Sequence, residues 1–194
     1  MGPEKIFQQG CPQGSPLSPL IHNIASSPLI HRVKEAVPEA KVVMYADDIS
    51  ILSSDPKVHA AGAKMQRALN AFAGEAARLH VKVAPEKSSL ILSSLDSSEK
   101  PENAPVISLA GQNVEYKQSA RILGVELDGK LTGAAQTEKA SAKMRKRLQC
   151  LGSLRGAGWG PPEGDLRQLY FAFARPAAFF AIGAWGPLLV KSHV

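Results

Sequence analysis

Two apolar runs of strand-like composition flank a pair of aspartates in residues 43–52, which read VMYADDISIL. The pattern predicts a β-hairpin with Asp47 and Asp48 at its tip. Each carboxylate makes the other harder to ionise, because like charges at close range disfavour the charged form. Strand formation alone therefore does not account for this pair.

The segment before this hairpin has the features of a helix start. Ser15-Pro16 and Ser18-Pro19 each offer an N-cap followed by proline at the first helical position, and apolar residues follow at helical spacing. We expect Pro28 to kink or interrupt the helix, which then resumes as far as the turn at Pro38.

A second helix is predicted after the hairpin. Asp55-Pro56 is another cap followed by proline, and the helical pattern extends to about His80. Its buried stripe consists of Met65, Leu69, Phe72, Ala76 and Leu79. The first part of the chain therefore reads helix, strand, strand, helix.

The rest of the chain changes from strand patterns to helix patterns. Short β-prone segments cover residues 88–95, 104–110 and 120–127, and helical patterns cover 134–151 and a final stretch from about Asp165. A Gly/Pro-rich break, GAGWGPPEG, separates the two helical patterns. This order predicts an α+β region followed by a mostly helical tail.

Composition limits the class of protein. Among 194 residues, 44% are hydrophobic and 21% are charged, which is typical of a soluble globular chain with a core. The net charge of +6 favours a polyanionic partner such as nucleic acid, although it also serves solubility. Cys11 and Cys150 are far apart and form no zinc or disulfide pattern, and the five histidines show no ligand spacing.

The most apolar stretch, residues 169–190, does not read as a membrane span. Arg175-Pro176 interrupts it, and Gly183 and Gly186-Pro187 break it again. Its large apolar residues recur at helical spacing, as in a helix that docks on a core. We therefore expect no membrane partner.

The aspartate pair has two explanations. Asp is a common turn residue, so the pair can be a polar hairpin turn. Alternatively, a divalent cation supplies the compensating charge, because Mg²⁺ takes oxygen ligands and keeps positions open for substrate phosphates. The Tyr45-Ala46 that precedes the pair, and the apolar strands on both sides, favour the second explanation.

Four boxes resemble a known family. The Tyr45–Asp48 unit resembles the Tyr-x-Asp-Asp signature of reverse transcriptases, and GCPQGSPLSPLIHNI (residues 10–24) is similar to their Pro-Gln-Gly loop and helix. LHVKVAPEKSSLILSS (79–94) resembles the lysine-bearing segment, and ILGVELDGKLT (122–132) resembles the turn called the primer grip. The tail is similar to the thumb of enzymes from non-LTR retrotransposons.

The resemblance implies a fold and an activity. The expected fold is α+β, a partial right-hand polymerase palm with an antiparallel sheet over residues 1–130, and a helical thumb over 131–194. The implied reaction transfers a dNTP onto a primer 3′-hydroxyl with two Mg²⁺ ions, an RNA template and a DNA primer. An intracellular, nuclear location would follow if the chain functions in retrotransposition.

The resemblance also assigns roles to residues around the reaction. Asp47 and Asp48 would hold metal, and Gln13, Gly14 and Tyr45 would lie at the template and nucleotide. Gln13 offers both a donor and an acceptor, and Gly10 and Gly14 allow a sharp turn; the alternative is a plain helix-entry turn.

Two further boxes have their own alternatives. Lys87 would act on departing pyrophosphate, although by itself it reads as a solvated lysine. Leu123 and Gly124 would hold the primer at a tight turn. On the following helix Lys139, Lys143, Lys146 and Arg147 share a face that could track phosphates or only be solvated.

One part of the family's pattern has no counterpart here. The family places another metal-binding aspartate, and the fingers, before the Pro-Gln-Gly box, whereas nine residues precede Gly10. Because a two-metal site needs ligands for both ions, we expect the chain alone to be inactive unless an upstream palm and fingers segment is supplied. The alternatives are a non-catalytic nucleic-acid-binding module and a translated retroelement remnant.

Overall fold

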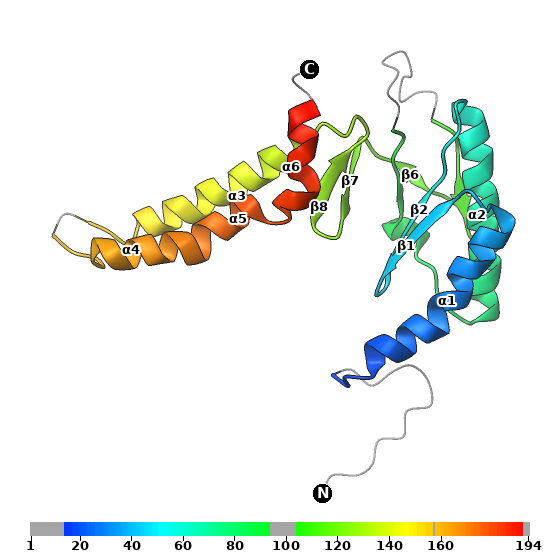
Figure 1. Cartoon of the computed structure of the whole chain (residues 1–194), viewed down its shortest axis with the longest axis horizontal. Helices are drawn as coiled ribbons and strands as arrows, with labels where there is room; N and C mark the ends of the chain where they lie inside the picture. Colours follow the sequence, from blue (N-terminus) through cyan, green and yellow to red (C-terminus); the bar gives the residue numbers. More distant parts are fainter. Residues whose placement is uncertain (1–13, 94–103, 157, 192–194) are drawn as a thin grey trace, which may run out of the picture. The chain divides into compact units, whose positions relative to one another are not determined.

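The computed structural model describes residues 14–93, 104–156 and 158–191, which divide into two units. The first unit contains residues 14–90 and 104–115, and the second contains residues 91–93 and 116–191. Figure 1 shows helices and short antiparallel strands in both. Gly10, Cys11 and Gln13, which the sequence singled out, lie outside the described residues.

The first unit has a helical pair and a hairpin as its main elements. In order these are α1 (Ser18–Ala36), β1 (Lys41–Tyr45), β2 (Asp48–Leu52) and α2 (Val58–Arg78). The 3₁₀ turn η1 (Pro85–Lys87) and the short strands β3 (Ser89–Leu90), β4 (Ser108–Leu109) and β5 (Gln112–Asn113) follow. The predicted order of helix, strand, strand, helix is confirmed.

The core of the first unit lies between α1 and α2. Its fully buried side chains include Leu29 and Val33 on α1 and Ala68 and Ala76 on α2. The inward residues of the β1–β2 hairpin, Val42, Ile49 and Ile51, pack against this core. The alternation along each strand therefore buries one face of the hairpin and leaves the other exposed.

The sequence predicted that Pro28 would kink or interrupt the first helix, and the structure shows that it does not interrupt α1. The helix continues from Ser18 to Ala36 with Pro28 inside it. Proline has no amide hydrogen, so the carbonyl of Ile24 loses its usual donor. The hydroxyl of Ser27 donates to that carbonyl at 3.0 Å and replaces the missing bond. A neighbouring side chain thus compensates for the proline.

The second unit combines a hairpin with helices. Its strands are β7 (Ser119–Ile122) and β8 (Val125–Asp128), and its first helix is α3 (Ala134–Gly152). A helical run follows, made of α4 (Glu163–Leu169), the π-helical segment η3 (Tyr170–Ala174) and α5 (Arg175–Phe179), and then α6 (Ile182–Lys191). The short strand β6 (Glu115–Tyr116) spans the point in the sequence at which the first unit ends and the second continues.

Packing in the second unit places the helical run along α3, as Figure 1 shows. Ala174 is fully buried there, and the side chain of Gln136 on α3 accepts a hydrogen bond from the amide of Glu126 on β8 at 2.9 Å. The indole of Trp185 donates to the carbonyl of Phe180 at 2.8 Å. Helices and hairpin are therefore joined by polar as well as apolar contacts.

The predicted final helix is divided. Its α4–α5 part and α6 meet at a break where Ala181 has a positive φ of 53°. Gly186-Pro187 does not break α6, which contains Pro187. Among the described helices, none is by itself long and apolar enough to cross a membrane, and one pair bent by 59° meets the length and composition test together.

The described strands are antiparallel where their register is given, and each sheet has two strands. The mixed α and β content that the sequence predicted is confirmed. The boundary between a palm at 1–130 and a thumb at 131–194 stays a prediction.

Candidate functional site

The aspartate pair lies at the tip of the β1–β2 hairpin. Tyr45 pairs with Asp48 across the strands, so Ala46 and Asp47 form a two-residue turn. Ala46 has a φ of 52°, a left-handed conformation that costs a non-glycine residue free energy. The prediction of a hairpin with both carboxylates at its tip is confirmed.

The tip is open to solvent. Tyr45, Asp47 and Asp48 are all exposed, and within the described residues neither carboxylate forms an ion pair. Two adjacent carboxylates without a cation repel one another, and an added cation would relieve that repulsion. Their oxygens are the ligand type that Mg²⁺ prefers, so the donors fit part of a magnesium site.

A histidine supports this turn from α1. The Nε2 atom of His22 lies 3.0 Å from the carbonyl oxygen of Ala46 and donates a hydrogen bond to it as an N–H tautomer. The contact joins the helix to the strained turn residue. Sequence reasoning missed His22, because the two residues are 24 positions apart and share no motif.

Two other predicted residues of the first unit, Gly14 and Lys87, have no described hydrogen bond or ion pair with the aspartates. Gly14 has a φ of 88° and open space around it, so its backbone suits a turn that leads into α1. Lys87 is exposed at the end of η1, after the buried Pro85. Among described side chains, His22 and the carboxylates do not form a group of three or more metal-binding residues.

The predicted primer-grip residues form a second tight turn. Leu123 and Gly124 connect β7 to β8 with φ values of 47° and 88°, as a type I′ turn requires. A Cβ atom on Gly124 would lie 3.0 Å from Cε1 of Phe180. The tight turn is confirmed, and its close neighbour is an aromatic ring from the same unit.

The basic face of α3 is only partly free. Lys139 forms an ion pair with Glu126, and its ammonium holds the pKa of that carboxyl below the ordinary value. Arg147 donates to the carbonyl of Phe173 and stacks 4.8 Å from the centroid of its ring. Within the described residues, Lys143 and Lys146 are exposed and have no such partner.

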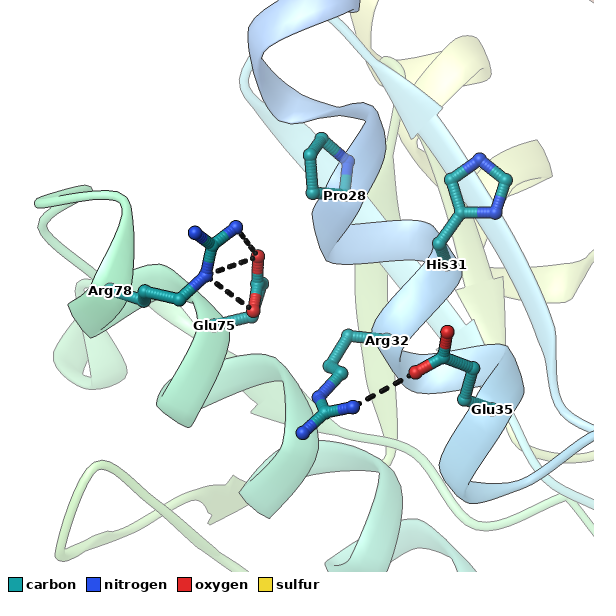
Figure 2. Close-up of a pocket in the computed structure, with 6 residues that line it drawn as sticks. All are labelled: Pro28, His31, Arg32, Glu35, Glu75 and Arg78. Carbon is teal, nitrogen blue, oxygen red and sulfur yellow. Dashed lines mark hydrogen bonds and ion pairs between the residues drawn. The ribbon is translucent and has the colours of Figure 1, made fainter.

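A shallow pocket of about 420 Å³ lies between α1 and α2, and most of the residues that line it are charged (Figure 2). Arg78 donates to Glu75, which lowers the pKa of that carboxyl, and Arg32 pairs with Glu35 at 2.9 Å. Pro28 and His31 complete the lining. Because each arginine already has a carboxylate, the pocket offers little net charge to a ligand.

Comparisons with known proteins agree with the boxes. The family model described as reverse transcriptase (RNA-dependent DNA polymerase) matches residues 3–127. The chain is 26% identical over 193 residues to "RNA-directed DNA polymerase from mobile element jockey" of Drosophila melanogaster, covering 98% of this chain and 20% of that protein.

A second relative from the same fly gives a similar result. Identity is 29% over 192 residues to "Probable RNA-directed DNA polymerase from transposon BS", covering 97% of this chain and 21% of that protein. The chain thus spans about a fifth of the length of these curated relatives. No solved structure matches it.

Proposed function

Because this chain belongs to the reverse transcriptase (RNA-dependent DNA polymerase) family and is of the non-LTR retrotransposon type, we propose that its hairpin tip contributes to an RNA-directed DNA polymerase site. The observation that carries the proposal is the pair of exposed carboxylates, Asp47 and Asp48, without a cationic partner in the described residues. The site would transfer a nucleotide onto a primer 3′-hydroxyl.

In this proposal Asp47 and Asp48 hold Mg²⁺. When bound, the metal supplies charge neutralisation at the phosphates and lowers the pKa of the attacking hydroxyl. The protein's own part is to present both carboxylates to solvent at the tip of the hairpin. His22 contributes by holding the Ala46 carbonyl, which limits rotation of the turn.

Other residues would position the substrates. Tyr45 lies beside the carboxylates on β1, where its exposed ring can contact the nucleotide, and Gln13 and Gly14 would face the template base. Lys87 would neutralise or protonate pyrophosphate, and Leu123 with Gly124 would contact the primer. The first unit would belong to a palm and the helices of the second to a thumb.

The proposed site needs a further carboxylate. A two-metal site holds its ions about 3.5–4 Å apart with ligands on both sides, and the family pattern assigns another aspartate to a strand ahead of the Pro-Gln-Gly loop. We expect these 194 residues alone not to extend a primer. Extension should require a palm and fingers segment that contains this aspartate.

Primer extension on an RNA template tests the proposal. The purified chain is assayed with and without a palm and fingers segment of a related reverse transcriptase, and we expect extension only with both. Asp47→Ala should abolish it, whereas Asp165→Ala, an exposed aspartate on α4, should not. Extension that survives Asp47→Ala would contradict the assignment, and Asp47-dependent extension by the chain alone would contradict the need for a further segment.

A second candidate function is duplex binding without catalysis. It is favoured by Lys143 and Lys146, which are exposed on α3 without a carboxylate partner among the described residues. Replacing both by Gln should weaken binding to an RNA–DNA duplex and flatten its salt dependence by about one unit of slope for each lost contact.

The matched control for duplex binding is Lys139→Gln. That ammonium is already engaged by Glu126, so its loss should change the slope less than the loss of Lys143 or Lys146. A slope that is the same in all variants would mean that α3 does not contact phosphates.

A further inference from the structure

Arginine and phenylalanine alternate along the helical run from α4 to α5. In chain order the residues are Arg167, Phe171, Arg175 and Phe179, each four positions after the last. The Arg167 guanidinium lies 5.8 Å from the Phe171 ring centroid, and that of Arg175 lies 5.5 Å from Phe171 and 5.7 Å from Phe179. All three distances are within cation–π range. We call these four side chains the Arg/Phe ladder.

The π-helical segment helps to keep the ladder on one face. Residues four apart in an α-helix advance by about 40° around the axis at each step, so a long series leaves its face. The π-helical turn at Tyr170–Ala174 holds more residues per turn and rotates later positions back. Arg175 can therefore contact rings on both sides of it.

The opposite side of this run is used for packing. Ala174 is fully buried, and Phe173 meets Arg147 of α3. The ladder itself is open, with Phe171 45% and Phe179 52% exposed. The guanidinium groups therefore do not cover the rings.

The ladder also carries uncompensated charge. Arg167 and Arg175 are exposed, and within the described residues neither forms an ion pair with a carboxylate. A partner for this face needs flat apolar rings that stack and anionic groups between them. Unpaired nucleotides have both, whereas the bases of a duplex are already stacked on one another.

We propose that the Arg/Phe ladder binds single-stranded RNA, with bases stacked on Phe171 and Phe179 and phosphates at Arg167 and Arg175. The choice of RNA rests on the proposed function, in which the template is RNA and is unpaired ahead of the primer. The stacking and charge arguments rest only on the ladder.

The test is fluorescence anisotropy of a short labelled oligouridylate with the whole chain. Phe171→Leu and Phe179→Leu keep apolar bulk but remove the aromatic face, and each should weaken binding by about tenfold. Phe171→Tyr and Phe179→Tyr keep the face and should bind as the unmodified chain does. This pairing separates stacking from loss of the fold.

Salt dependence separates the roles within the ladder. Replacing Arg167 or Arg175 by Gln should lower the slope of log affinity against log salt by about 0.7 for each lost phosphate contact. The two Leu variants should leave the slope unchanged. Phe173→Leu is the matched control, because that ring lies in the same π-helical segment, is 40% exposed and stacks on Arg147 outside the ladder.

Several results would overturn the inference. If Phe173→Leu and Phe171→Leu lowered the affinity for oligouridylate equally, the ladder would not be the RNA contact. Unchanged affinity in both ladder Leu variants would lead to the same conclusion. Ladder-dependent binding of oligodeoxythymidylate, anionic vesicles or a second copy of the chain, without binding of oligouridylate, would assign the face to another partner. Asp47-dependent extension and duplex binding through Lys143 are measured separately, so their failure is distinguishable from failure of the ladder.

Discussion

The two units each present a hairpin with a two-residue turn, and the turns differ in what surrounds them. At β7–β8, Leu123 and Gly124 both have positive φ, and the ring of Phe180 lies against the glycine. At β1–β2, only Ala46 has a positive φ. The neighbouring Asp47 and Asp48 form no ion pair with any of the described residues.

The charged residues of the two hairpins differ in the same way. Glu126 on β8 is paired with Lys139 and accepts a hydrogen bond from Ser119 at 3.1 Å. Asp48 on β2 has neither kind of contact in the described chain. His22 supports the backbone of the β1–β2 turn, but its carboxylates have no described partner. Charges that are paired within their own chain are typical of a structural element, whereas unpaired ones are suited to an external ligand.

The largest effect should come from exchanging the turn residues. Gly124→Ala places a side chain at a φ of 88° and displaces Phe180, which is 53% exposed and can move, so the strain sets the cost at about 1–2 kcal/mol. Ala46→Gly should not destabilise the chain, because glycine accepts the φ of 52°. Urea unfolding midpoints measure the stability of both variants. A similar loss of stability in both would show that the two turns have the same backbone requirement.

A smaller effect should follow from neutralising Glu126. The Lys139 ammonium lowers the pKa of this carboxyl, so the ion pair stabilises the fold above the unfolded pKa of about 4.3 and is lost as the pH falls through the folded pKa. Glu126→Gln should cost about 0.5–1 kcal/mol at neutral pH, because Lys139 is half exposed.

The pH dependence checks the cause of that loss. The free energies of unfolding of Glu126→Gln and of the unmodified chain should converge as the pH falls through the lowered folded pKa of Glu126, because below it the carboxyl is protonated in both states. A difference that persists unchanged in acid would mean that the substitution acts through packing rather than through charge.

The smallest effect on stability should come from Asp47→Asn. This side chain is exposed and has no described partner, so the free energy of unfolding should change by less than about 0.5 kcal/mol. Binding of Mn²⁺, followed by the loss of its free paramagnetic signal, should nevertheless weaken. Glu126→Gln should bind Mn²⁺ as the unmodified chain does. A clear loss of stability in Asp47→Asn would instead show that Asp47 has a structural role.

Local pattern was enough to predict the site hairpin and both helices of the first unit. Alternating apolar residues mark β1 and β2, and the stripe containing Phe72 and Ala76 marks α2, because each pattern records which side of one element is buried. The turn at Leu123 and Gly124 was also predictable from local sequence, because glycine adopts the positive φ that a tight turn requires at this position.

Contacts between distant residues were not predictable in this way. Periodicity placed Lys139 and Arg147 on a free basic face, but Glu126 lies 13 positions from Lys139 and Phe173 lies 26 from Arg147. His22 was passed over because its partner is a backbone carbonyl, which carries no residue-specific signal. The described β-strands also pair two by two, which strand propensity does not specify.

The hydroxyl that replaces the missing donor at Pro28 has a consequence for the order of mutations. The Ser27 hydroxyl has little to add at the Ile24 carbonyl while residue 28 has an amide hydrogen, but it takes over as a donor to that carbonyl once proline is present. A lineage can therefore acquire the serine first and the proline afterwards at little cost, whereas the reverse path passes through an intermediate with an unpaired carbonyl. Positions 27 and 28 should therefore vary together among relatives. Serine should be replaced only in relatives that have already lost the proline.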